Sequence, residues 1–142
     1  MAENDAMYFD GFPEPWYQKP PVMLEGLEEQ LELLMDGQLG LMFECELEKI
    51  PPDLLLQLTL GNIIGEATEA GEHFGDITKP WKKNLNADVD HIKKELIDIL
   101  HFLLQAFIIV GMDGNEVFAA YNQKNRENFR RIMAKRREMN GD

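Results

Sequence analysis

The chain has 142 residues, 44% of them hydrophobic, which suits a single domain with a buried core. It carries 26 acidic and 14 basic side chains, and a net charge of -12 excludes nucleic acid and anionic membrane as bulk partners. The charge is uneven, because only Lys19 and Lys49 among the basic residues precede residue 79. An acidic front half and a basic tail suggest a site that binds both metal and anions.

Cys45 is the only cysteine, so no intrachain disulfide is possible, and the start of the chain lacks the basic-then-apolar order of a signal peptide. We therefore expect a cytoplasmic protein. The most apolar run, residues 96–110, is shorter than the ~20 residues that span a bilayer and includes Asp98, His101 and Gln105. It is predicted to be a buried helix rather than a membrane span.

Residues 1–22 combine four prolines with five aromatic residues and show neither a helical nor an alternating period. This composition predicts an extended arm before a single domain over residues 23–142. The arm is either a loose terminus or a segment that packs its aromatic rings on a neighbouring subunit.

The domain begins with an amphipathic helix from Met23, weakened at Gly37 and Gly40, and a second apolar stretch follows to Ile50. After the proline pair at 51–52, Asp53 is the predicted cap of a helix over about 54–74. Residues 75–87 are expected to form a turn and a loop. Asp88 is the predicted cap of a helix that extends to about residue 110, and a last helix spans about 115–138. Because no segment alternates with period two, the predicted fold class is an all-α helical bundle.

Helix 88–110 has one narrow polar stripe in an otherwise apolar circumference. A helix that is apolar nearly all round is expected to be buried, and buried carboxylates are costly unless they are paired or bind metal. The stripe consists of His91, Glu95, Asp98, Phe102 and Gln105.

The preceding helix has the same design, with Asn62, Glu66, Glu69 and His73 on one face. We expect the two acidic stripes to face each other. Residues three apart lie on adjacent turns, so Glu66 with Glu69 and Glu95 with Asp98 would converge on Mg²⁺, for which Mn²⁺ may substitute. The opposite, apolar face would comprise Leu56, Leu60, Ile63, Ala67, Ala70 and Phe74.

In so acidic a chain, either acidic pair alone is equally compatible with a solvated surface. The position of Glu95 and Asp98 inside an apolar helix favours the metal site. On the last helix, cations and amides at helical spacing are candidates for binding phosphate oxygens, whereas Lys135, Arg136 and Arg137 are explained by the helix dipole. The candidates are Tyr121, Lys124, Asn125, Asn128 and Arg131.

Together these motifs resemble the all-α nucleotide pyrophosphohydrolases, the superfamily of dimeric dUTPases and MazG-like enzymes, and the dimeric dUTPases most closely. The resemblance covers about residues 66–131. Its parts are Glu66-Ala-Thr-Glu69, Pro80-Trp81-Lys82-Lys83, Glu95-Leu-Ile-Asp98, His101-Phe102, and the pattern from Tyr121 through Lys124, Asn125 and Asn128 to Arg131.

The resemblance implies cleavage of a nucleoside triphosphate between the α and β phosphates, with Mg²⁺ held by the four carboxylates and Glu66 positioning the attacking water. His101 and Phe102 would lie against deoxyribose, Phe102 leaving no room for a 2′-hydroxyl, and Trp81 would flank the base. Lys124, Asn125 and Arg131 would hold the outer phosphates, from either the same or a second subunit of a homodimer.

Two positions stay open within this resemblance. Gln30 matches the glutamine that reads uracil in the family, but Gln38 competes with it. Glu72 forms a second Glu-x-x-Glu with Glu69 and competes with Glu66 as a ligand.

Three other functions are compatible with parts of the sequence. A MazG-like enzyme would use the same chemistry on another deoxynucleotide, such as dCTP or dGTP. A di-iron bundle is suggested by Asp98-x-x-His101 but requires a Glu-x-x-His motif on two helices, and the second is missing. A non-catalytic helical interaction protein would leave the acidic face and the basic tail as solvated surfaces.

Overall fold

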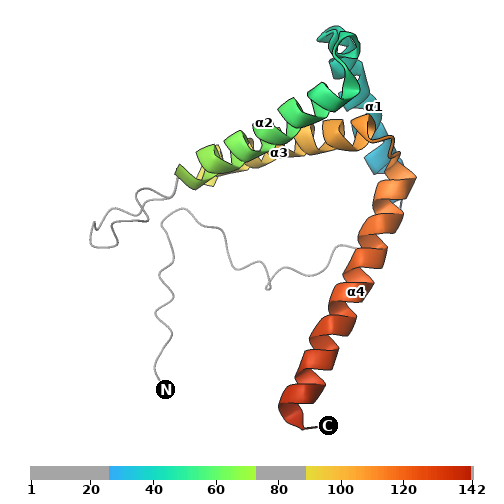
Figure 1. The fold of residues 1–142 in the computed structure, drawn as a ribbon, viewed down its shortest axis with the longest axis vertical. Helices are drawn as coiled ribbons and strands as arrows, with labels where there is room; N and C mark the ends of the chain where they lie inside the picture. The colour runs from blue at the N-terminus through green and yellow to red at the C-terminus, as the bar shows by residue number, and fades with distance from the viewer. Residues whose placement is uncertain (1–25, 73–88, 142) are drawn as a thin grey trace, which may run out of the picture.

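The computed structural model describes residues 26–72 and 89–141, which form four α-helices, one short 3₁₀ helix and no strand (Figure 1). The predicted all-α class is confirmed over these residues. The N-terminal arm and the loop with Trp81 lie outside them, as do His73, Phe74 and Asp88.

Helix α1 spans Leu27–Glu44 and continues through Gly37 and Gly40, so the two glycines expected to weaken the helix do not end it. A glycine in a helix costs only about 1 kcal/mol relative to alanine, and tertiary packing offsets it. Met35, Gln38 and Met42 are the buried positions that anchor this helix, at spacings of three and four. The 3₁₀ helix η2, Leu47–Lys49, follows.

Helices α2, Pro52–Glu72, and α3, Val89–Ile109, run side by side (Figure 1) and pack against each other more extensively than any other pair. Asp53 lies inside the first turn of α2 rather than at its cap, and the carbonyl of Pro51 accepts the backbone N–H of Leu55 at 2.9 Å. The reason is that proline suits the first helical position, where no N–H is needed. After α3, Gly111 adopts a φ of 82°, which favours glycine.

Helix α4, Gly114–Asn140, lies at 106° to α3 and packs mainly on α1. Asp113, a cap missing from the prediction, accepts the N–H of Glu116 at 2.8 Å, and Glu32 of α1 accepts the N–H of Asn115 at 3.1 Å. Beyond this junction α4 extends away from α2 and α3 (Figure 1). No single helix in the described ranges is long and apolar enough to cross a membrane, although α3 and α4 meet that length and composition test as a bent pair.

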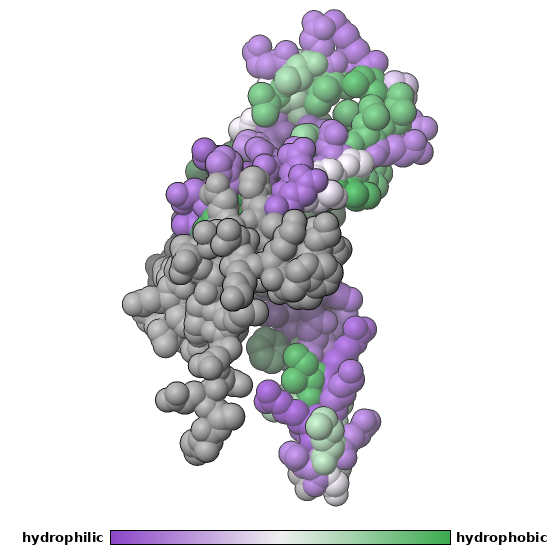
Figure 2. Space-filling model, turned by 90° about the vertical axis from the view of Figure 1, so that its left-hand side faces the viewer, coloured by the Kyte–Doolittle hydropathy of each residue, from purple (hydrophilic) through white to green (hydrophobic). Residues whose placement is uncertain are grey.

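The described core is small, because only five hydrophobic residues in it are buried, each with 4% to 8% of its surface exposed: Met35, Met42, Leu55, Leu104 and Ala106. The expectation that α3 is buried all round is wrong for one chain, in which Leu96 is 54% exposed and Val110 is also exposed. On α2, Leu60 and Ala67 of the predicted inward face are exposed too. Both helices have too few neighbours within one chain to cover their circumference. Figure 2 shows hydrophobic surface at the upper end of the molecule, where Figure 1 shows the end of α1 and the beginning of α2.

Candidate functional site

Three carboxylates from two helices meet where α2 and α3 face each other. One carboxylate oxygen from each of Glu66, Glu69 and Glu95 lies within 4.8 Å of the other two, close enough for one cation to contact all three. Both helices contribute. Glu66 and Glu69, three residues apart, project from adjacent turns of α2, and Glu95 comes from α3. The predicted convergence of the acidic stripes is therefore observed for these three residues, while their role as ligands stays a prediction.

Crowding of these acids changes the proton affinity of Glu66. Its pKa is raised from the ordinary 4.5 to about 7, chiefly by a hydrogen bond with Glu95, then by partial desolvation, and then by the negative charges of Glu69, Glu95 and Asp98. The carboxylates of this site therefore repel one another electrostatically. A divalent cation would relieve this repulsion, which makes the site suitable for a hard metal ion.

Beside the carboxylates, α1, α2 and α3 enclose a cavity of about 630 Å³, within the usual range for small-molecule sites. Asp98 lines it, as does Glu66, so the fourth predicted ligand opens onto the same space. His101 and Phe102 line it one turn further along α3. The structure therefore places acidic, aromatic and imidazole groups around one cavity, as the sequence predicts.

Polar side chains that line this cavity form a chain of hydrogen bonds, buried except at His101. His101 Nδ1 lies 2.8 Å from Gln38 Oε1, and Gln38 Nε2 donates to Gln105 Oε1 at 3.4 Å. Gln105 Nε2 donates to Thr59 Oγ1 at 2.8 Å, and Thr59 Oγ1 donates to the Leu55 carbonyl at 2.7 Å. Three helices are joined by these bonds.

The two competing glutamines of α1 lie at different places in the structure. Gln38 lines the cavity with the acids, whereas Gln30 lines a separate groove between α1 and α4, together with Tyr121. The two positions are eight residues apart on one helix, so they lie about 12 Å apart along its axis. Only Gln38 is placed to meet a ligand of the carboxylate cavity within one chain.

The predicted phosphate-binding residues of α4 are exposed and lie on the helix that extends away from α2 and α3 (Figure 1). Lys124 pairs with Glu127 at 3.8 Å. One chain therefore does not bring this group to the carboxylates. The group comprises Lys124, Asn125, Asn128 and Arg131.

Two further predicted site residues, Trp81 and Glu72, are not among the converging groups of the described residues. Trp81 lies outside the described residues. Glu72 is exposed at the end of α2 and does not belong to the group of three converging carboxylates. Glu66 is therefore the better placed of the two competing ligands.

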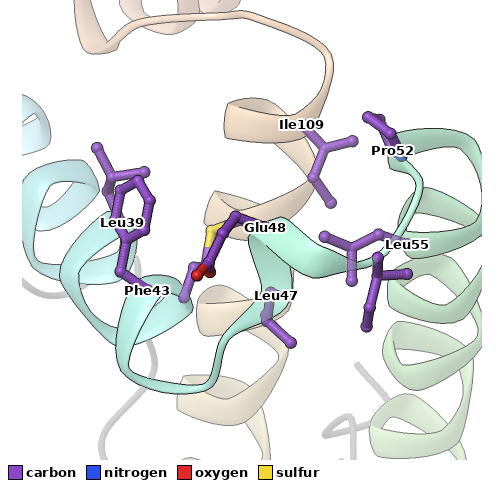
Figure 3. Close-up of a pocket in the computed structure, with 9 residues that line it drawn as sticks. Leu39, Phe43, Leu47, Glu48, Pro52, Leu55 and Ile109 are labelled. Atoms are coloured by element: carbon purple, nitrogen blue, oxygen red, sulfur yellow. The ribbon is translucent and has the colours of Figure 1, made fainter.

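A smaller groove of about 310 Å³ borders the cavity on its other side (Figure 3). Its labelled lining is apolar apart from Glu48, with Phe43 and Leu39 on α1 opposite Ile109 and Pro52. Such a lining offers a single carboxylate, that of Glu48, and no set of metal ligands. The chemistry of the described chain is concentrated at the carboxylate cavity.

Sequence reasoning missed Thr59, the most buried polar residue described, with 0% exposure. Its signal was present, because Thr59, Asn62 and Glu66 follow one another at helical spacing on α2 and all line the cavity. An isolated threonine in an apolar stretch is indistinguishable from a core residue until its neighbours are known. Asn62 and Gln105 were recognised as polar positions, but the partners of Gln105, Gln38 and Thr59, were not.

Comparison with known proteins finds a family match over the part of the chain that contains this site. Residues 58–115 match the family model described as dUTPase, a segment that contains all four acids of the site together with Thr59, His101, Phe102 and Gln105. The match confirms, over these residues, the predicted resemblance to the all-α nucleotide pyrophosphohydrolases.

Two curated proteins are also similar. The dCTP pyrophosphatase of Enterobacteria phage LZ5 is 36% identical over 88 residues, which is 54% of this chain and 49% of that protein. The dCTP pyrophosphatase of Enterobacteria phage T4 is 34% identical over 80 residues, 48% of this chain and 47% of that protein. The chain thus matches about half the length of each relative. No solved structure is significantly similar to it.

Proposed function

With residues 58–115 matching the dUTPase family, we propose that this protein is a Mg²⁺-dependent nucleoside triphosphate pyrophosphohydrolase with dUTP as its preferred substrate. The reaction cleaves between the α and β phosphates and yields a monophosphate and pyrophosphate. The observation that carries the proposal is the convergence of Glu66, Glu69 and Glu95 beside a cavity lined by Phe102 and Gln38.

The donor set fits magnesium. Carboxylate oxygens are hard, anionic ligands, and the raised pKa of Glu66 reflects its hydrogen bond with Glu95, desolvation and the negative charges of the neighbouring acids. Glu66, Glu69 and Glu95 would hold the ion, with Asp98 adjoining them on the cavity wall. When bound, Mg²⁺ supplies charge neutralisation for phosphate oxygens and lowers the pKa of a coordinated water.

The other residues orient the nucleotide. Phe102 packs against the sugar, where a 2′-hydroxyl would be buried against an aromatic face without a partner at a cost of about 1–3 kcal/mol. His101, next to it on the cavity wall, contacts the same sugar. Gln38 presents an amide, which pairs with the donor and acceptor groups of a pyrimidine edge. Deoxyribose is therefore favoured over ribose by about tenfold to a hundredfold.

The binding of the outer phosphates involves a second copy of the chain. Lys124, Asn125 and Arg131 are on the part of α4 that extends away from the body, so another subunit must supply them. The uncovered hydrophobic residues of α3 support such an assembly, because they would be buried between subunits. A homodimer is the smallest assembly that both brings the basic residues of α4 to a second subunit's carboxylates and covers the exposed hydrophobic residues of α3.

A second candidate function is a pyrophosphohydrolase for dCTP, favoured by the printed names of the two phage relatives. It keeps every role above except base choice, because an amide side chain can pair with either uracil or cytosine.

Specificity constants for dUTP, UTP, dCTP and dTTP, measured through pyrophosphate release with Mg²⁺, test the proposal. We expect dUTP to exceed UTP and dCTP, and no turnover after chelation of the metal. Equal values for dUTP and UTP would contradict the role of Phe102, and a preference for dCTP would select the second candidate. An absence of hydrolysis of every triphosphate, without stabilisation by Mg²⁺, would favour a non-catalytic protein.

A further inference from the structure

The buried hydrogen-bond chain below the cavity has a direction. Three of its side chains are almost fully buried, with exposures of 5% for Gln38, 0% for Thr59 and 6% for Gln105, and the fourth, His101, is exposed at the cavity wall. Buried polar atoms must find partners, so each amide has to present the correct end to the next group. The structure leaves no buried side-chain nitrogen or oxygen without a partner among the described residues.

The direction of these hydrogen bonds is set at the end opposite His101, where Thr59 meets the Leu55 carbonyl. The Leu55 carbonyl can only accept a hydrogen bond, so the hydroxyl of Thr59 must donate its single proton to it, at an oxygen–oxygen distance of 2.7 Å. Thr59 Oγ1 is then an acceptor for Gln105, which must present its NH₂ group. The carbonyl end of Gln105 consequently faces Gln38, and Gln38 must direct its own NH₂ group toward it.

The same logic continues to the cavity wall. With its NH₂ group directed at Gln105, Gln38 turns Oε1 toward His101, and only a protonated Nδ1 can complete the 2.8 Å bond. A hydroxyl on α2 thus determines the orientation of an amide on α1 and the tautomer of an imidazole on α3. Neither Thr59 nor Gln105 needs to touch a nucleotide to have this effect.

We propose that Thr59 and Gln105 are positioning residues that fix the direction of the Gln38 amide and thereby the pyrimidine that the cavity accepts. The proposal rests on the proposed function, because it assumes that a nucleotide base reaches Gln38.

The two candidate bases differ where the direction of an amide matters. Uracil has a donor at N3 and an acceptor at O4, whereas cytosine has an acceptor at N3 and a donor at N4. A freely rotating amide can serve either base by turning over, but an amide held in one direction rejects the base that leaves buried groups unpaired. A fixed Gln38 therefore discriminates between dUTP and dCTP, and a released Gln38 does not.

Thr59→Val tests this inference, since it keeps the shape of the side chain and removes the hydroxyl. Thr59→Ser restores the hydroxyl and serves as the rescue variant, and Thr59→Ala replaces Thr59→Val if that protein does not fold. The matched control is Thr68→Val, because Thr68 Oγ1 makes the same bond to the carbonyl four residues earlier, Ile64, at 2.9 Å on the same helix but is exposed.

The first readout is the tautomer of His101 in the protein without nucleotide. Long-range ¹H–¹⁵N spectra at alkaline pH distinguish a proton on Nδ1 from one on Nε2, and loss of the signal in His101→Gln assigns it. We expect Nδ1–H to dominate in the wild type, Thr59→Ser and Thr68→Val, and a mixture to appear in Thr59→Val. An unchanged tautomer in Thr59→Val, or Nε2–H in the wild type, would overturn the inferred direction.

The second readout is the ratio of kcat/KM for dUTP to that for dCTP. We expect discrimination to fall about tenfold in Thr59→Val, the effect of one misplaced hydrogen bond, and to persist in Thr59→Ser and Thr68→Val. A changed tautomer with an unchanged ratio, or a wild type with no discrimination, would refute the link to base choice. A wild type that hydrolyses neither nucleotide would refute the proposed function, while the tautomer would still decide the direction of the chain.

Discussion

At the scale of single residues, acids on two helices lie closer together than their charges favour. This crowding raises the pKa of Glu66 to about 7. The causes are the hydrogen bond to Glu95, desolvation and the neighbouring negative charges. The position of Glu66 next to the cavity makes a metal ion the simplest compensating partner. Two predictions follow from this arrangement, one on activity and one on pH.

Glu95→Gln and Asp98→Asn keep the size of the side chain and remove an anionic ligand. We expect kcat/KM to fall by about a thousandfold or more with unchanged helix content, because the charge lost is one that acts in the transition state. Pyrophosphate release and circular dichroism provide the two measurements. Glu72→Gln, an exposed position on the last turn of α2, is the matched control and should keep nearly full activity. Near-normal turnover in both site variants would exclude the metal site.

The raised pKa of Glu66 links stability to pH. Because its folded pKa of about 7 exceeds the ordinary 4.5, the folded protein binds a proton that the unfolded chain releases between these values. Stability therefore falls as pH rises from about 4.5 through 7, and Mg²⁺, which favours the ionised form, should flatten this dependence. Urea denaturation across this range, with and without Mg²⁺, measures both effects. Glu66→Gln removes the titrating group and should lose this component, and an unchanged pH profile in that variant would count against the assignment.

At the scale of elements, the junction between α1 and α4 determines where the basic helix points. Gly114 is buried there, and a Cβ at this position would lie 2.9 Å from both the backbone nitrogen and the Cδ of Glu32. Glu32 also accepts the N–H of Asn115, a favourable place for a carboxylate at a helix N-terminus. The bend of 106° between α3 and α4 is thus held by close contact rather than by a flexible turn.

Gly114→Ala is expected to destabilise the protein by about 1–3 kcal/mol, the usual cost of forcing an extra methyl into a packed site, because backbone atoms cannot move aside as a side chain would. Thermal or urea denaturation measures the change. Gly37→Ala is the control, since nothing lies within 4 Å of its added Cβ and alanine favours the helix by up to about 1 kcal/mol. Equal stability of Gly114→Ala and the wild type would show that the junction is not tightly packed.

At the scale of the whole molecule, the exposed hydrophobic surface of α3 and the position of the basic residues of α4 both indicate a second subunit. On α3, Leu96, Leu100 and Leu103 share one face and are all exposed in a single chain. An exposed apolar stripe of this kind indicates an interaction surface. The bases of α4 lie away from the acids of the same chain, so a second copy would both cover the stripe and complete the charge pattern.

We expect at least a homodimer by light scattering at micromolar concentration, with Leu100→Lys shifting the protein toward a monomer because a charge cannot be buried in an apolar interface. Met139→Lys makes the same exchange at the end of α4, where the side chain is already 85% exposed, and should leave the assembly intact. A monomeric wild type would contradict both the dimer and the shared phosphate site.

The sequence by itself determined the helices and the two acidic stripes, because a 3.6-residue period is a local property that residue spacing records directly. It placed Glu66, Glu69, Glu95 and Asp98 on faces that do meet. It could not choose between Gln30 and Gln38, since both lie on α1 and only the packing of that helix decides which one reaches the cavity.

Only the tertiary structure decided the partners of Thr59 and Gln105, which lie on different helices 46 residues apart. It also corrected the expected burial of α3, because burial depends on how many neighbours surround a helix and not on its own composition. The direction of α4 depends in turn on the contact between Gly114 and Glu32, more than 80 residues apart in the chain. Such contacts are fixed by the crossing of helices, and no local period in the sequence encodes that geometry.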